Sequence, residues 1–265
     1  MSPLADGRML VDSHCHLTSP PLRGQLAGVL GRAVAAGVGH VVTIGTDPQD
    51  ARAALSLPHD APRVWVAAGV HPHESAKVTG DWLAELDILA GDARVVALGE
   101  MGLDYHYDFS PRQRQQAVFA EQLGLADRLG TPVVIHCREA HADCVSILSD
   151  LRNVTRVVFH CFTGTAAEAD DILSRGWWIS LTGVVTFKNA RELADVARRL
   201  PPDQFMIETD APYLSPEPVR HVRPNEPAHV AHIARRLAEI RDVEFDELAA
   251  LTAGNAARFF GWPVR

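Results

Sequence analysis

Cysteine is scarce in this sequence, and no two cysteines stand at close spacing. The four in 265 residues are Cys15, Cys137, Cys144 and Cys161, and they form no C-x-x-C motif. So few cysteines cannot build the disulfide framework of a small secreted domain. They suit a reducing compartment.

Long apolar runs are missing as well. No stretch approaches the ~20 apolar residues that a membrane-spanning helix needs. The first 30 residues lack the basic-then-apolar order of a signal peptide. We therefore expect a soluble, cytoplasmic protein with no membrane partner, and we expect a monomer because nothing indicates an oligomer.

Positive charge is in deficit. The chain has 25 Lys and Arg against 33 Asp and Glu, which gives a formal net charge of −8. Such a chain does not offer the broad basic face that holds duplex DNA, because neutralised phosphates supply most non-specific affinity. An enzyme that grips one or two phosphates beside metal cations in a pocket stays open.

Eight apolar, β-branched stretches alternate with segments of helical period. They lie at residues 8–14, 40–46, 64–70, 94–100, 131–136, 155–160, 176–183 and 203–210. Most are continuous apolar runs, as expected for a parallel sheet covered by helices. The pattern predicts an α/β fold, a (β/α)8 TIM barrel that forms a single domain over residues 1–265. An open doubly wound sheet is the alternative.

Helix boundaries are marked by capping signals. Ser110 with Gln113, and Thr165 with Glu168, have the spacing of a capping box. Gly130 stands where a helix is expected to end.

Histidine is plentiful, with 13 in the chain. Residues able to bind a metal stand at the carboxyl ends of six predicted strands: His14, His16, His71, Glu100, His136, His160 and Asp210. Because these ends surround the active site of a barrel, we expect the side chains to converge there. Imidazole with carboxylate suits Zn, Mn, Co or Fe, and also admits Mg.

The cysteines next to these histidines call for a separate explanation. Strand side chains alternate, so His14 and His16 are predicted to point to one side and Cys15 to the other. The same argument places Cys137 and Cys161 behind the ligands. We interpret all three as small buried apolar residues.

Eight ordered segments form a distinctive set. They are DSHCHL (12–17), GVHPH (69–73), GEMGLDYHYD (99–108), VIHCREA (134–140), HCFTGTAAEA (160–169), ISLTGVVTFK (179–188), ETDAPYL (208–214) and NEP (225–227). Together they resemble the TatD family of metal-dependent hydrolases, over nearly the whole chain. The resemblance implies a barrel of the amidohydrolase superfamily with two divalent metal ions, Zn, Mg or Mn. In many members it implies a deoxyribonuclease, often exonucleolytic from the 3′ end.

The resemblance also implies a set of ligands. They are His14, His16 and Asp210 for one ion, His136 and His160 for the other, and Glu100 as a bridge between them. Many relatives in the superfamily bridge with a carboxylated lysine. The fourth strand here offers Glu100 and no lysine, which fits the TatD branch.

Roles in catalysis follow for a few residues. Asp210 is predicted to orient the attacking water and accept its proton, with Glu100 beside it and His71 at the substrate phosphate or the leaving oxygen. Arg138 is a candidate phosphate clamp, because a guanidinium matches phosphate in a bidentate way. A structural salt bridge is its alternative.

Other residues have two interpretations each. Glu208 either supports a metal-binding histidine or is an interior hydrogen-bonded carboxylate. Asp104 either binds substrate or supports a ligand. Arg223, or Arg220 in its place, is predicted to meet the substrate phosphate.

The leading hypothesis is a 3′–5′ exodeoxyribonuclease acting on single-stranded or frayed DNA ends. One alternative is a metal-dependent hydrolase of ester or amide bonds, such as a D-aminoacyl-tRNA deacylase. Another is a metal-binding scaffold without catalysis.

Overall fold

The computed structural model describes residues 10–149 and 151–262. These residues divide into two compact units. Unit 1 contains the described residues within 1–43, 58–65 and 161–265, and unit 2 contains those within 44–57 and 66–160.

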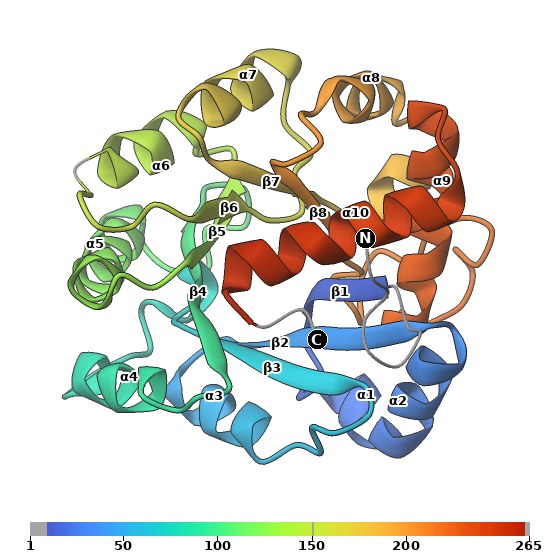
Figure 1. Ribbon diagram of the computed structural model, residues 1–265. Coiled ribbons are helices and arrows are strands. Elements are labelled where there is room, and N and C mark those ends of the chain that lie inside the picture. The colour runs from blue at the N-terminus through green and yellow to red at the C-terminus, as the bar shows by residue number, and fades with distance from the viewer. Residues whose placement is uncertain (1–9, 150, 263–265) are drawn as a thin grey trace. The chain divides into compact units, whose positions relative to one another are not determined.

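The described strands form an eight-stranded sheet in which neighbours follow chain order (Figure 1). They are β1 (Leu10–Cys15), β2 (Val38–Gly45), β3 (Arg63–Ala68), β4 (Val95–Asp104), β5 (Val133–Arg138), β6 (Val157–Phe159), β7 (Trp178–Leu181) and β8 (Phe205–Ile207). The recorded strand pairings are parallel. Within unit 1 the chain beyond β8 pairs with β1, since Asp210 N donates to His14 O at 2.9 Å. The fold is the predicted (β/α)8 TIM barrel and not an open doubly wound sheet.

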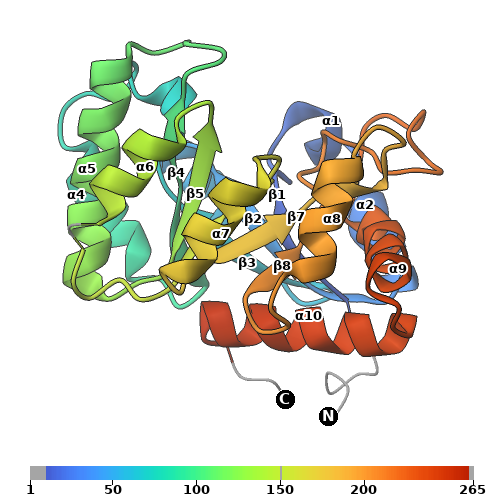
Figure 2. The ribbon, with the colours of Figure 1, turned by 90° about the horizontal axis from the view of Figure 1, so that it is seen from above.

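Helices follow most strands. They are α1 (Pro20–Arg23), α2 (Leu26–Ala35), α3 (Pro48–Leu55), α4 (Trp82–Ala90), α5 (Arg112–Leu129), α6 (His141–Leu148), α7 (Ala166–Ser174), α8 (Arg191–Arg199), α9 (Val230–Arg241) and α10 (Phe245–Phe260). Short 3-10 turns are η1 (Pro72–Glu74), η2 (Gly183–Thr186) and η3 (Pro227–His229). In unit 1, α10 crosses the amino end of β8 (Figure 2), where Asn255 Nδ2 donates to Phe205 O at 2.8 Å.

All eight predicted strands occur, with shifted ends. Residues 8 and 9 of the first predicted strand lie outside the described residues. The predictions that strand four ends at Glu100 and strand five at His136 are wrong, because β4 continues to Asp104 and β5 to Arg138. Gly102 permits the extension: its φ is +141°, and a Cβ there would lie 2.0 Å from His136 O. Only glycine fits such a close approach of two strands.

Two of the predicted helix signals are confirmed. Thr165 and Glu168 form a capping box at the start of α7. Gly130 ends α5 in the left-handed conformation, at φ 63°, which glycine adopts without steric penalty.

The cap predicted at Ser110 is wrong. Helix α5 begins at Arg112 without a side-chain cap. The Ser110 hydroxyl instead donates to His73 O at 3.0 Å and accepts from Ala76 N at 3.1 Å. A contact to another loop has replaced the local cap.

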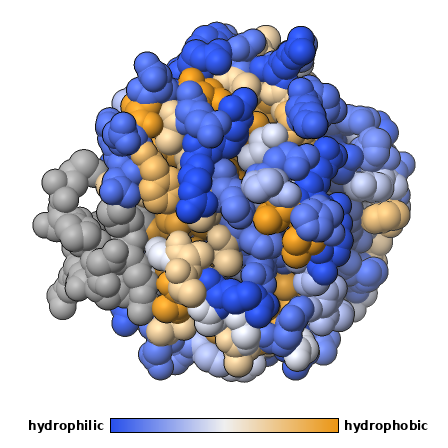
Figure 3. All heavy atoms as spheres, turned by 90° about the vertical axis from the view of Figure 1, so that its right-hand side faces the viewer, coloured by the Kyte–Doolittle hydropathy of each residue, from blue (hydrophilic) through white to orange (hydrophobic). Residues whose placement is uncertain are grey.

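Among the described residues, no helix combines the length and the apolar character needed to cross a bilayer. The face drawn in Figure 3 carries mostly hydrophilic side chains, with apolar ones scattered among them.

Candidate metal centre

In unit 1, His14, His16 and Asp210 form a cluster that we call the unit 1 cluster. Asp210 Oδ1 lies 3.7 Å from His14 Nε2 and 3.4 Å from His16 Nε2. Cys15, between the histidines, is fully buried, with its Sγ 3.6 Å from Val42 O. The predicted alternation of His14, Cys15 and His16 is therefore confirmed. The interpretation of Cys137 and Cys161 as buried residues is wrong, because both are only partly buried. Cys161 also lies beyond β6 and has φ 47°, so strand alternation does not apply to it.

A buried aspartate that the sequence analysis missed supports this cluster. Asp12 accepts from Thr209 N at 2.8 Å and from Thr209 Oγ1 at 2.6 Å. Burial raises the pKa of Asp12 to about 8, although these hydrogen bonds act in the opposite direction. Asp12 thus ties the strand of His14 to the segment of Asp210. Its position two residues before His14 was the available signal.

Glu208 also joins elements of unit 1. Its Oε1 accepts from Cys161 N at 2.7 Å, and its Oε2 accepts from Ser180 Oγ at 2.6 Å and Ser13 Oγ at 3.3 Å. The side chain is almost fully buried. Through these bonds it links β1, β7 and the residue after His160, while its direct support of a histidine stays a prediction.

In unit 2, the carboxylate of Glu100 lies among three imidazoles. Its Oε1 is 2.6 Å from His136 Nδ1, 2.7 Å from His160 Nε2 and 3.3 Å from His71 Nε2. Ligand atoms of His71, Glu100 and His136 all lie within 4.8 Å of one another, close enough to share an ion. We call these four residues the unit 2 cluster.

Asp104 lies on the other side of His136. Its Oδ2 is 3.1 Å from His136 Nε2 and 2.9 Å from His73 Nε2, and its Oδ1 accepts from Tyr107 N at 2.8 Å. Burial would raise the pKa of Asp104, but these hydrogen bonds outweigh it and lower the pKa. Burial lowers the pKa of His136, yet the bonds to Asp104 and Glu100 prevail and raise it.

His71 differs electrostatically from His136. Burial lowers the pKa of His71 to about 4, although Glu100 acts to raise it. Its Nδ1 accepts from His73 N at 3.1 Å. The neutral ring therefore carries its proton on Nε2, toward Glu100.

Both clusters have the donor chemistry of a divalent metal site. Each combines imidazole nitrogens with a carboxylate, the donor set that suits Zn and Mn in proteins. In the unit 2 cluster, Asp104 could accept the Nε2 proton of His136 while Nδ1 binds an ion, the usual carboxylate–histidine–metal arrangement. The residues present fit the ions that the resemblance implies.

The predicted phosphate-binding arginines differ in their surroundings. Arg138 is exposed, and its guanidinium lies 4.6 Å from the centre of the Tyr107 ring. Within the described part of the chain, the Arg138 side chain has no ion-pair partner, so the salt-bridge alternative finds no support. The guanidinium of Arg220 lies 3.9 Å from the centre of the Phe187 ring, and its Nη1 lies 4.0 Å from Glu217 Oε1. Arg223 is exposed, and its role stays a prediction.

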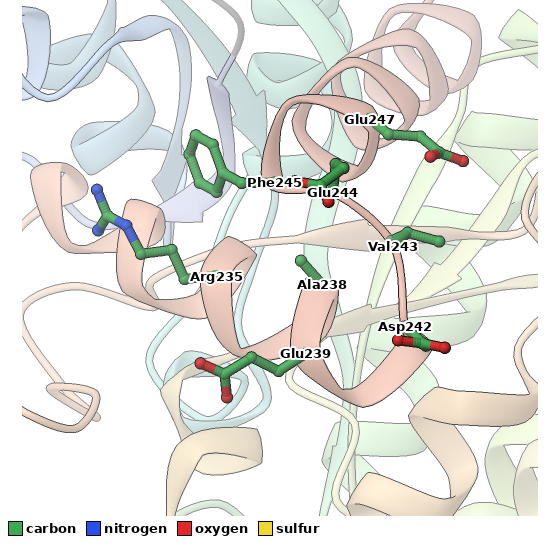
Figure 4. Close-up of a pocket in the computed structure, with 8 residues that line it drawn as sticks. All are labelled: Arg235, Ala238, Glu239, Asp242, Val243, Glu244, Phe245 and Glu247. Atoms are coloured by element: carbon green, nitrogen blue, oxygen red, sulfur yellow. The ribbon is translucent and has the colours of Figure 1, made fainter.

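A separate hollow of about 490 Å³ lies at the connection between α9 and α10 (Figure 4). Its eight lining residues include four carboxylates and no histidine. Figure 4 shows those carboxylates spread around the hollow instead of converging. Among the described residues, this hollow therefore fits a metal ion less well than the two histidine–carboxylate clusters do.

Comparison with known proteins agrees with the geometry. The family model described as "TatD related DNase" matches residues 11–261. An uncharacterized metal-dependent hydrolase YabD of Bacillus subtilis is 38% identical over 253 residues, covering 95% of this chain and 99% of its own length. A 3′-5′ ssDNA/RNA exonuclease TatD of Enterobacter lignolyticus is 39% identical over 257 residues, covering 95% and 99%.

A solved structure extends the likeness to three dimensions. The TatD homologue YjjV of Escherichia coli superposes with a TM-score of 0.89 at 32% identity, over 97% of this chain and 99% of that one. This likeness and the match of the family model over residues 11–261 lead to one conclusion. The chain belongs to the TatD family of metal-dependent hydrolases.

Proposed function

We propose that this protein is a two-metal phosphodiesterase that removes nucleotides from the 3′ end of single-stranded or frayed DNA. Relatives that are 38–39% identical bear the name 3′-5′ ssDNA/RNA exonuclease. The acidic chain favours grip on a strand end over a long duplex footprint.

The proposed ligands come from both clusters. They are His14, His16 and Asp210 for one ion, His136 and His160 for the other, and Glu100 as the bridge. This assignment rests on the general rule that strand carboxyl ends surround the active site of a TIM barrel. Divalent ions held there would supply Lewis acidity and would lower the pKa of a bound water.

The protein's own side chains then have separate tasks. Asp210 accepts the proton of the attacking water, because it is the more exposed carboxylate of the two clusters. Asp104 fixes the ring of His136 by accepting from Nε2. His71, whose Nε2 proton points toward Glu100, is the residue we assign to the substrate phosphate or the leaving oxygen. Arg138 offers its guanidinium to a phosphate.

One observation carries the proposal most directly. A single buried oxygen of Glu100 lies within 3.3 Å of three imidazole nitrogens. A buried carboxylate surrounded by imidazoles is a poor packing element but a good metal ligand.

The test is hydrolysis of 3′- and 5′-labelled oligonucleotides by purified protein with Mg, Mn or Zn. We expect stepwise shortening from the 3′ end by the wild type and none by His136→Ala. His59→Ala, a change of an exposed histidine, is the matched control and retains full activity. Equal products from wild type and His136→Ala would refute the site. Faster release of a D-amino acid from tRNA would instead favour the ester-hydrolase alternative.

A further inference from the structure

Two exposed aromatic rings lie on the segment between β4 and α5. Tyr107 is 48% exposed and Phe109 is 66% exposed. Their rings are nearly parallel, with an interplanar angle of 13° and centroids 5.3 Å apart. Planar apolar rings offered to solvent on a loop are typical of binding surfaces.

His73 connects this ring pair to the unit 2 cluster. The His73 ring centroid is 4.7 Å from that of Phe109, 4.4 Å from that of His71 and 6.0 Å from that of His136. One imidazole therefore separates the exposed pair from the proposed metal ligands. A substrate bound at these ligands would therefore lie next to the ring pair.

Buried polar contacts hold the loop of the ring pair in place. Asp104 accepts from Tyr107 N, and Gln115, itself fully buried, accepts from Asp104 N at 2.8 Å. The Gln115 amide also donates to Ser110 O at 2.8 Å. The backbone on both sides of Phe109 is thus fixed before any ligand arrives, which lowers the entropy lost on binding.

Positive charge stands next to the rings. The guanidinium of Arg138 lies over the Tyr107 ring, at 4.6 Å from its centre. A planar ring beside a cation matches the two parts of a nucleotide, its base and its phosphate.

We propose that Phe109 and Tyr107 form a stacking subsite for one unpaired nucleobase of a single-stranded nucleic acid. The inference rests on the proposed function, since it names what holds the substrate next to that site. Stacking accepts any base but needs its face free, so the subsite selects unpaired ends without reading their sequence.

Binding of a fluorescent oligonucleotide tests the subsite. The probe is a single-stranded hexanucleotide with cleavage-resistant phosphorothioate linkages and 2-aminopurine at its 3′-terminal or penultimate position, added to metal-loaded protein. Stacking quenches 2-aminopurine, so wild type is expected to quench it strongly at one of the two positions. Phe109→Leu keeps the apolar volume but removes the planar ring. We expect it to lose the quenching and to raise Kd about 10-fold to 100-fold.

The control is Ile88→Ala, which removes an exposed apolar side chain (78% exposed) from α4 of the same unit. It is expected to leave both quenching and Kd unchanged. Unchanged quenching and Kd in Phe109→Leu, or no binding by wild type, would overturn the subsite. The proposed function fails on a different readout, the absence of cleavage of an unmodified oligonucleotide by wild type.

Discussion

The two histidine–carboxylate clusters are built from the same residue types but differ in how tightly they are closed. In the unit 2 cluster, Glu100 approaches His136 and His160 to 2.6 and 2.7 Å, which are hydrogen-bond distances. In the unit 1 cluster, Asp210 stays 3.4 Å or more from both imidazoles. In the unit 2 cluster, short contacts between Glu100 and the imidazoles fix the geometry. In the unit 1 cluster, the geometry depends on the hydrogen bonds from Thr209 to Asp12, which hold the neighbouring backbone.

The clusters also differ in access to solvent. Asp210 is 14% exposed and Glu100 is 2% exposed. We therefore expect the unit 2 cluster to contribute more to the stability of the fold, and Asp210 to be the carboxylate that water reaches more easily. Two clusters of the same residue types need not contribute equally to stability.

Removing one carboxylate from each cluster gives the largest expected effects. Glu100→Gln and Asp210→Asn should each lower kcat/KM by on the order of 10³-fold, because each removes a negative charge from the proposed metal ligands. Only Glu100→Gln should also lower the free energy of unfolding, by about 2 kcal/mol, since it breaks buried charged hydrogen bonds. Kinetics with denaturant titration checks both. Equal destabilisation by the two substitutions would contradict the difference between the clusters.

Removing metal should separate the clusters next. Ions whose Kd for the folded state is 100-fold below their free concentration stabilise that state by about 2.7 kcal/mol. Removal of the ions by a chelator should therefore lower Tm. Hydrogen exchange should then rise more around β1 and Asp210 than around β4 and β5, where hydrogen bonds persist. Restored Tm on adding Mn or Zn is the control. A Tm indifferent to chelator would contradict the account.

Asp104→Asn sharpens the role of the bond to His136. The neutral amide of the variant accepts the Nε2 proton of His136 less strongly than the carboxylate does. Metal affinity and kcat should therefore fall about 10-fold to 100-fold. Isothermal titration with Mn or Zn measures the affinity. The matched change, Asp108→Asn on the same loop, removes an exposed carboxylate and should change neither quantity.

Arg138→Ala should have the smallest effect. We expect KM for an oligonucleotide to rise about 10-fold with kcat little changed, because a phosphate contact is lost in ground and transition states alike. Arg138→Lys should raise KM less than Arg138→Ala does, because lysine keeps the positive charge. It should not reach the wild-type KM, because an ammonium cannot bind phosphate in a bidentate way. A fall in kcat with unchanged KM would contradict the clamp.

Sequence reasoning reached the barrel because continuous apolar runs report burial on both faces of a sheet. It predicted His14, His16 and Asp210 as ligands from their places at the ends of such runs, and these three side chains do lie close together. It placed the ends of β4 and β5 too early, since only the contact of Gly102 with His136 O shows why the strands continue.

Long-range pairing was beyond sequence reasoning. The bond of Asp12 to Thr209 joins residues 197 positions apart, and no local pattern marks it. The same holds for Ser110, which was predicted to cap a helix. Its hydroxyl donates instead to the carbonyl of His73, 37 residues away. The sequence left two roles open for Asp104, binding of substrate or support of a ligand. Its carboxylate lies between the imidazoles of His73 and His136, which favours support of a ligand.

Metal content per chain tests the central claim most directly. Elemental analysis of protein dialysed against trace Zn or Mn should give two ions per chain for wild type and about one for His136→Ala, because the unit 1 ligands remain intact in that variant. Wild type without bound ions, or the same content in both proteins, would contradict the claim that these strand ends hold a pair of cations.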